Sequence, residues 1–276
     1  MGPQTPQRAV RLAHALAELE RRFGPGVVAR LRDRPGGAPA DRAVPSGSVG
    51  LDRATGPGDL PRGHLTEYLG PESSGKTTLL YAALAATQRA RGLVALVDTE
   101  GSADGATLAA CGVDLDHLII ARPTSARDAL LLLTILARCG GVDALGLGSI
   151  AALRDLPTGA NHAAPIERAT LDTARLLTRS LRVLTAALKD GPTAVLATNP
   201  TLPSPYDLTS LRELPPHRST GGLALRHFAA LRIAVTPLAS GSPIERWRVG
   251  CRPTPRAISR RRRGSMWRAG GAIFRS

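Results

Sequence analysis

The stretch that decides the fold is residues 69–78, which read LGPESSGKTT. They contain the spacing G-x-x-x-x-G-K-T of a phosphate-binding loop. Gly70 and Gly75 allow the backbone to wrap closely, so that successive N–H groups point at phosphate oxygens. Lys76 brings a positive charge to the outer phosphates, and Thr77 offers a hydroxyl to Mg²⁺. The stretch therefore predicts a site for the phosphates of a nucleotide.

Both flanks of this loop support the prediction. Residues 64–69 alternate in the manner of a strand, and residues 79–86 form a mostly apolar run that predicts a helix. The positive end of that helix would face the phosphates. A chance glycine-rich turn would lack this order of strand, loop and helix, so the phosphate loop is the favoured interpretation.

Composition sets the class of protein and its partners. The 276 residues suffice for one large α/β domain, and the net charge is +14. Such a charge predicts a polyanionic partner, nucleic acid above all, with a generally solvated basic surface as the alternative. Three widely spaced cysteines predict neither a metal site nor disulfides, and no apolar run approaches a membrane span or a signal peptide. We therefore expect a cytoplasmic protein without membrane contact.

The chain before the loop predicts a separate N-terminal element. Residues 7–23 have the period of an amphipathic helix, whose apolar face carries Leu12, Leu16, Leu19 and Phe23. This face either packs on its own domain or docks on another subunit. We expect an oligomerisation helix and a short strand over residues 1–33, a linker over 34–45 and the core over 46–276.

Strands and helices alternate through the core. The predicted strands are 93–98, 118–121, 142–150 and 193–198, and the predicted helices are 103–111, 126–139 and 166–189. This alternation predicts an α/β fold with a mostly parallel sheet covered by helices on both faces. Strands 231–235 and 246–251 follow. The basic run 259–263 is either a nucleic-acid contact or a solvated strand end.

Several motifs along the chain resemble those of the RecA family, in the family's order. They are RFGPG at 22–26, SGSVGLD at 46–52, GPESSGKTT at 70–78 and STGGLAL at 219–225. The resemblance implies a RecA-like phosphate-loop core without a separate C-terminal domain, which binds ATP, Mg²⁺ and single-stranded DNA and self-associates through its N-terminal helix. The implied ATP-binding residues are Gly70, Pro71, Glu72, Ser73, Ser74, Gly75, Lys76, Thr77 and Thr78, with Thr77 at the metal.

The resemblance also assigns residues beyond the loop. Glu100, just past the strand 93–98, is the implied catalytic residue that activates water, or else an ordinary exposed loop acid. Asn199 stands at the position of the family's γ-phosphate-sensing glutamine and is the implied γ-phosphate sensor. The implied DNA-facing loops are 156–165 and 201–219. The candidate DNA-binding residues are Arg218, Thr220, Gly221, Gly222 and Arg226; a proline-rich surface loop is the alternative.

Some positions depart from the family's pattern. Gly148 stands where the family has a metal-side aspartate, and Thr107 replaces the tyrosine that stacks on adenine. Asp143 cannot substitute, because five residues of strand place it roughly 16 Å away. We therefore predict nucleotide binding with slow hydrolysis.

Two functions remain open at this point. The first is a RecA-like protein of DNA repair and recombination that binds ATP and single-stranded DNA, as a diverged paralogue with weak hydrolysis. The second is an ImuA-type adaptor in mutagenic (SOS) translesion synthesis, acting through contacts with a polymerase-like protein. A phosphate-loop kinase or transport ATPase is disfavoured by the residues 219–225.

Overall fold

The computed structural model describes residues 6–23, 43–55, 60–153, 166–189, 191–202, 218–219, 222–237, 247–253 and 272–274. The chain divides into two units. One comprises Met1–Gly37 with Arg260–Gly264, and the other Ala38–Ser259 with Ser265–Ser276. In the described part of the chain, no helix is long and apolar enough to cross a membrane.

The described part of the smaller unit is the helix α1 (Pro6–Phe23), which confirms the predicted helix. Its sequence is rich in Ala, Leu, Arg and Glu, all strong helix formers. Arg21 and Arg22 in the last turn complement the negative end of the helix dipole. Val10 and Leu12 are exposed. The short extended piece predicted at 27–31 lies outside the described residues.

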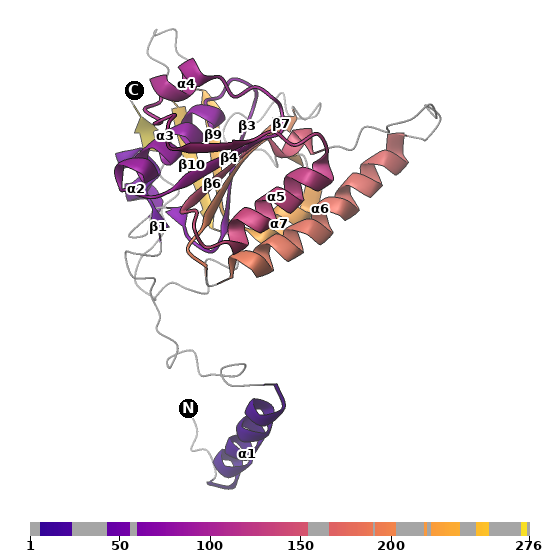
Figure 1. Ribbon diagram of the computed structural model, residues 1–276. Helices are drawn as coiled ribbons and strands as arrows, with labels where there is room; N and C mark the ends of the chain where they lie inside the picture. The colour runs from indigo at the N-terminus through magenta and orange to yellow at the C-terminus, as the bar shows by residue number, and fades with distance from the viewer. Residues whose placement is uncertain are drawn as a thin grey trace, which may run out of the picture. The chain divides into compact units, whose positions relative to one another are not determined.

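The larger unit is built on a twisted sheet (Figure 1). Six of its described strands are parallel, in the spatial order β9 (Ala229–Pro237), β3 (Leu65–Gly70), β7 (Ala194–Leu202), β6 (Ala144–Gly148), β4 (Val94–Asp98) and β5 (Leu118–Ala121). Beyond β9, the strands β10 (Trp247–Pro253) and β11 (Ala272–Phe274) continue antiparallel, and β8 (Arg218–Ser219) pairs antiparallel with the end of β7.

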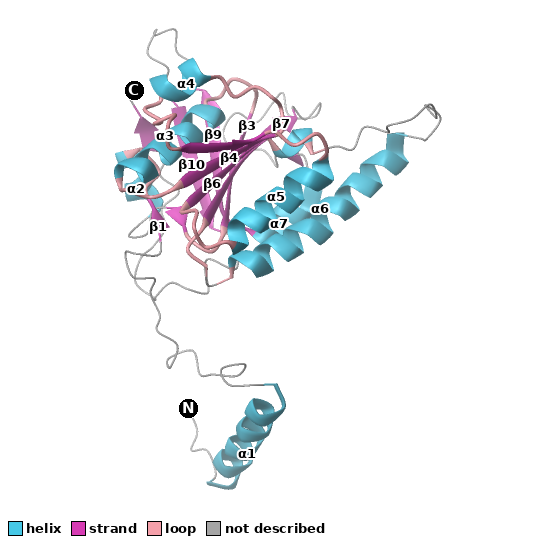
Figure 2. Ribbon diagram, viewed as in Figure 1, coloured by secondary structure: helices cyan, strands magenta, loops and turns pink. Residues whose placement is uncertain are grey.

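Helices cover both faces of this sheet (Figure 2). One face carries α2 (Val49–Thr55), α3 (Lys76–Arg89) and α4 (Gly105–Ala110), and the other α5 (Ala126–Arg138), α6 (Ile166–Leu188) and α7 (Gly222–Phe228). The side chains of Asp104 and Ser125 cap α4 and α5 by accepting from backbone N–H groups. The predicted α/β fold with a mostly parallel, doubly covered sheet is confirmed.

Several element bounds differ from prediction. The helix α3 begins at Lys76 rather than 79, and the strand expected over 142–150 is β6, followed by a short 3₁₀ turn at Ile150–Ala152. The helices α2 and α7 were not predicted. Each has only seven residues, which is too short for a helical period of apolar residues to be recognised in the sequence. The strand β1 (Ala43–Val44) lies within the expected linker, where it pairs with β2 (Leu60–Pro61).

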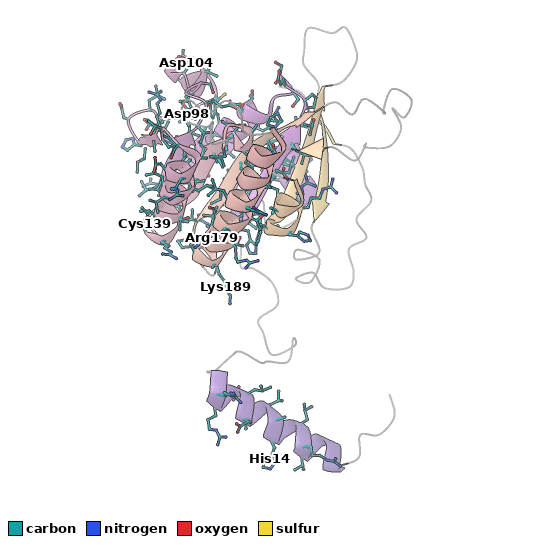
Figure 3. All side chains as sticks on the ribbon, turned by 90° about the vertical axis from the view of Figure 1, so that its right-hand side faces the viewer. His14, Asp98, Asp104, Cys139, Arg179 and Lys189 are labelled. Carbon is teal, nitrogen blue, oxygen red and sulfur yellow. The ribbon has the colours of Figure 1, made fainter. Side chains whose placement is uncertain are left out.

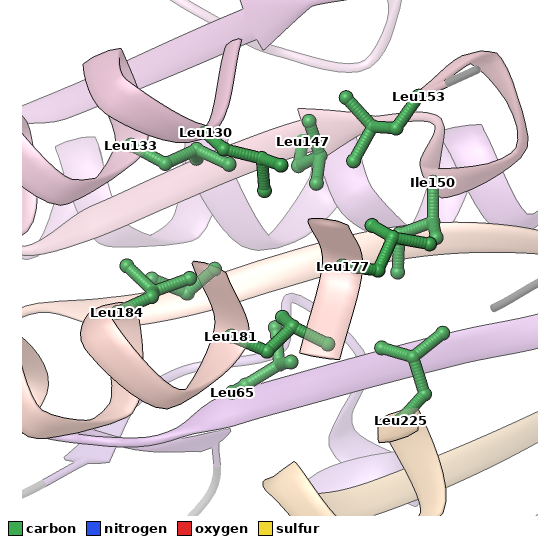
Figure 4. A pocket seen from close by; sticks show the side chains of 11 residues that line it. Leu65, Leu130, Leu133, Leu147, Ile150, Leu153, Leu177, Leu181, Leu184 and Leu225 are labelled. Atoms are coloured by element: carbon green, nitrogen blue, oxygen red, sulfur yellow. The ribbon is translucent and has the colours of Figure 1, made fainter. Parts of the chain in front are cut away.

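The layer between the sheet and α5, α6 and α7 encloses a small cavity (Figure 4). Its lining is aliphatic: Leu65, Leu130, Leu133, Leu147, Ile150, Leu153, Leu177, Leu181, Leu184, Val195 and Leu225. An apolar space without polar partners does not hold ordered water. The cavity is therefore a feature of core packing rather than a ligand site.

An ion pair between Arg62 and Asp143 lies at the edge of the sheet opposite the phosphate loop. Arg62 Nη1 donates to Asp143 Oδ1 at 2.5 Å and to the carbonyl of Pro192 at 2.7 Å. The second oxygen of Asp143 accepts from the N–H of Leu93 at 2.8 Å. Asp143 is thus a structural carboxylate far from the nucleotide site, which confirms that it does not replace a metal-side aspartate.

Candidate nucleotide-binding site

The phosphate loop joins the end of β3 to the start of α3. All six residues of β3 are buried. A Cβ on Gly70 would lie 2.1 Å from the carbonyl oxygen of Val235, so the neighbouring strand β9 admits only glycine here. Gly75 precedes α3 with φ 89°, a left-handed conformation that favours glycine. The two glycines of the motif are therefore required by the loop's backbone.

Lys76 lies over the loop. Its Nζ donates to the carbonyl of Pro71 at 2.6 Å, and the residue is buried. Burial lowers the pKa of Lys76, while the nearby charges of Glu72 and Glu100 act to raise it. A phosphate placed in the loop would compensate this desolvated ammonium.

Three hydroxyls complete the start of α3. Thr77 and Thr78 are exposed, and Ser74 is fully buried with no hydrogen-bond partner for its Oγ. A buried hydroxyl without a partner is costly and calls for a functional explanation. Together with the free N–H groups of the helix N-terminus, these residues fit the phosphates of a nucleotide, and the Thr77 hydroxyl fits a Mg²⁺ ligand.

Glu100 reaches the same edge of the sheet from β4. It is exposed, and its charge acts on Lys76, so the structure brings together the loop and the predicted catalytic carboxylate. Asp98, the last residue of β4, holds the segment that carries Glu100. Its carboxylate accepts from the N–H groups of Ser102 at 3.2 Å and Ala103 at 3.1 Å.

Arg122 also holds the segment that follows β4. Its Nη2 donates to the carbonyl of Ala103 at 3.1 Å, and its Nε lies 3.5 Å from Asp98 Oδ2. Asp98 is buried while the Arg122 side chain is 60% exposed. Sequence reasoning missed both roles, because Asp98 and Arg122 meet only when β4 and β5 pair. Figure 3 shows Asp98 and Asp104 near each other at this end of the unit.

Gly148 ends β6 beside this segment. The Thr99 hydroxyl lies 2.9 Å from the carbonyl oxygens of both Gly148 and Ser149, which share its one proton, and it accepts from the N–H of Ser149. A Cβ on Gly148 would meet only Thr198 Oγ1, at an ordinary contact distance of 3.9 Å. The backbone thus leaves room for the side chain that the glycine lacks.

The segment expected at the adenine base begins at α4. Thr107 is exposed, and its hydroxyl donates to Asp104, the cap of the helix. On α3, burial raises the pKa of the Tyr81 phenol, and the Asp98 carboxylate raises it further. In this arrangement Thr107 lies in the first turn of α4, bonded to the cap residue Asp104, and offers no aromatic surface to a base.

Asn199 lies in β7 opposite Leu69, one residue before the loop. It is fully buried, and its Nδ2 donates to Glu67 Oε1 at 2.7 Å. Its role toward the γ-phosphate stays a prediction.

The candidate DNA residues are described only in part. Arg218 lies in β8, Gly222 begins α7, and Arg226 is exposed on α7, whereas Thr220 and Gly221 lie outside the described residues. The loop 156–165, most of 201–219 and the basic run 259–263 also lie outside them. The structure therefore leaves the assignment of these residues a prediction.

A basic stripe on α6 was missed from the sequence. Arg175, Arg179 and Arg182 are exposed, as is Lys189 just after the helix. Their spacing of four, three and seven residues places all four on one helical face, and residues 174–189 contain no Asp or Glu. Figure 3 shows Arg179 and Lys189 along this helix. The spacing could have revealed the stripe once a helix was expected over 166–189.

The fold and the loop together define a phosphate-loop protein with a mostly parallel sheet. A sequence model of the RecA N-terminal domain matches residues 10–245. Protein RecA of Streptomyces avermitilis is 39% identical over 232 residues, which cover 80% of this chain and 56% of that protein. Protein RecA of Salinispora arenicola is 38% identical over 247 residues, which cover 85% and 65%. The chain belongs to the RecA family, and it spans between about half and two thirds of the length of these relatives.

Proposed function

We propose that the protein binds ATP with Mg²⁺ and single-stranded DNA, and that it acts in DNA recombination and repair. The observation that carries this proposal is the phosphate loop with Lys76 and Glu100 at one edge of the sheet, in a chain of the RecA family. Family membership supports the role in repair, and the net charge of +14 supports a nucleic-acid partner.

Different residues of the loop would bind different parts of the nucleotide and its metal ion. The backbone N–H groups from Ser73 to Thr77 and the Lys76 ammonium would bind the phosphates, and the Thr77 hydroxyl would bind the metal. The metal supplies charge compensation at the phosphates. Glu100 is placed to orient and deprotonate a water molecule. With Gly148 at the end of β6, hydrolysis should be slow.

The basic stripe on α6 allows the proposed binding of DNA to be tested. Replacing Arg179 and Arg182 together by alanine should weaken binding of a fluorescent single strand and flatten its dependence on salt. Two phosphate contacts account for a slope change of about 1.4 in log K against log [salt]. The measurement is fluorescence anisotropy across a salt series, with the ATP analogue present.

The matched control replaces Arg89 and Arg91 by alanine. Both are exposed and lie at the end of α3, among the helices of the other face. This control removes the same charge and should change the slope less. Equal slopes for the two double variants would remove α6 from the DNA interface. The pair Arg218→Ala and Arg226→Ala tests the hairpin and α7 in the same assay.

We further propose that α1 mediates self-association. Its apolar face needs a partner. The larger unit exposes Ile119 on β5, together with Leu131 and Ile135, which lie one turn apart on α5. We propose that α1 of one copy binds these three side chains of another copy. Leu131→Glu should shift the sedimentation of the full chain toward the monomer, whereas Ala109→Glu on α4 should not. Identical sedimentation of both variants and the parent would argue against this contact.

An adaptor role in translesion synthesis is the second candidate. Gly148 favours it, because an adaptor that works through protein contacts does not need rapid hydrolysis. The partner would be a polymerase-like protein. Strong stimulation of ATP hydrolysis by single-stranded DNA, abolished by Glu100→Gln, would contradict the adaptor role and leave the recombination role in place.

A further inference from the structure

Thr99 lies between the end of β4 and the candidate catalytic residue Glu100. Its backbone N–H donates to the carbonyl of Gly148 at 3.0 Å. Its hydroxyl oxygen lies 2.9 Å from each of three backbone groups, which are the carbonyl oxygens of Gly148 and Ser149 and the N–H of Ser149. A single residue therefore joins the chain just before Glu100 to the end of the neighbouring strand β6.

The hydroxyl contacts lie just beyond the regular pairing of these two strands. The register of β4 and β6 ends at Asp98 and Gly148, and Ser149 is buried while Thr99 is half-buried. Rotation about χ1 would break all three hydroxyl contacts, so the Thr99 side chain is held in one rotamer. The backbone bond of Thr99 does not involve the hydroxyl. Pairing of the strands therefore does not by itself require a threonine here.

The chain on the other side of Glu100 is held less directly. Gly101 has a φ of 65°, a conformation that favours glycine, and a Cβ placed there would meet no atom within 4 Å. The next anchor is Asp98, whose carboxylate accepts from the N–H groups of residues 102–103. Glu100 thus lies between a residue fixed on β6 and a glycine that nothing packs against. The neighbour that fixes the Glu100 backbone is Thr99.

We propose that Thr99 is a positioning residue for ATP hydrolysis. Its hydroxyl holds the Glu100 backbone against the end of β6, and so keeps the Glu100 carboxylate where it can orient and deprotonate water. Thr99 acts through Glu100, because its own hydroxyl is engaged by the backbone of Gly148 and Ser149. Positioning matters because a displacement of about 1 Å can cost on the order of 100-fold in rate. The proposal rests on the proposed function, in which ATP occupies the loop and Glu100 acts on water.

The test compares the parent with Thr99→Val, which keeps the shape of the side chain and removes the hydroxyl. Single-turnover hydrolysis of ATP is measured in Mg²⁺, and binding is measured with a non-hydrolysable ATP analogue. We expect the rate to fall by about 10- to 100-fold. The affinity for the analogue should stay within about twofold, because residue 99 lies outside the phosphate loop. Thr99→Ser keeps the hydroxyl and should retain most of the parent's rate.

A double-mutant cycle with Glu100→Gln separates positioning from a general loss of structure. Once the carboxylate is gone, Thr99→Val should change the residual rate by less than about twofold, whereas a general structural effect would lower both rates alike. Thr134→Val is the matched control. The Thr134 hydroxyl donates to the carbonyl of Leu130 at 2.8 Å within α5, on the face of the sheet opposite α3, so its loss should leave the rate unchanged.

An unchanged rate in Thr99→Val would overturn the proposal, as would the same fold loss in the parent and in the Glu100→Gln background. Thr99→Ala is a second way to remove the hydroxyl. If circular dichroism shows that neither variant folds, the hydroxyl serves stability and the proposal fails. A parent whose hydrolysis does not depend on Glu100 would also refute it, while ATP binding stands. A parent that binds no ATP would instead overturn the proposed function.

Discussion

Replacing Lys76 with alanine lowers the affinity for ATP by about 10- to 150-fold, the loss expected for a charge-assisted hydrogen bond to phosphate. The ammonium is buried and donates to the carbonyl of Pro71, within the loop that would hold the phosphates. The measurement is titration of a fluorescent ATP analogue, with thermal unfolding recorded for each variant.

Lys189→Ala is the matched control, because the chain contains only these two lysines and Lys189 is exposed after α6. It should leave the ATP affinity unchanged. An unchanged affinity in Lys76→Ala would refute the nucleotide site. The pH dependence gives a further check, because only the protonated amine attracts phosphate and burial lowers the pKa of Lys76. Binding should therefore weaken as pH rises, from a lower pH than an ordinary lysine would require.

Replacing Gly148 with aspartate raises the rate of ATP hydrolysis, by about 10- to 100-fold, the usual effect of a residue that orients a metal through its ligands. The position accepts a side chain, because a Cβ there meets only Thr198 Oγ1 at 3.9 Å. A carboxylate at the end of β6 would face the edge that carries Thr77 and Glu100. Single-turnover hydrolysis in Mg²⁺ measures the effect.

Gly148→Asn has nearly the same shape without the charge, so it separates the metal effect from a change in packing. We expect it to hydrolyse ATP no faster than the parent. Equal rates for the aspartate and asparagine variants would show that Gly148 is not the reason for slow hydrolysis. A rapid parent rate would show that the protein compensates for the glycine.

The phosphate loop was predictable because its requirements are local. Gly70 and Gly75 meet backbone constraints that the structure confirms at 2.1 Å from Val235 and at φ 89°. The six parallel strands of the sheet were also predictable, since strands buried on both faces appear as apolar runs, whereas the short strands β8 and β11 were not predicted. The short helices α2 and α7 were not predictable from the sequence. They are recognised only in the folded structure, where they pack on the hydrophobic core.

The candidate site beyond the loop depended on long-range pairing. Asp98 and Arg122 are 24 residues apart, and Glu67 and Arg232 are 165 apart. No pattern of spacing along the chain joins such residues, because their contact depends on the order of strands in the sheet. Asn199 illustrates the difference, since its place in the sequence predicts a role at the phosphate while only the folded sheet shows that its amide nitrogen bonds to Glu67.

The sequence by itself determined the phosphate loop, the α/β class and the family, because each is carried by residues adjacent or regularly spaced in the chain. The tertiary structure alone decided which side chains meet at the carboxyl edge of the sheet. It placed Glu100 near Lys76, left room at Gly148, and buried Glu67 of β3 between Asn199 of β7 and Arg232 of β9. The physical reason is that parallel pairing brings distant strand ends to one edge, and only the folded sheet fixes their order.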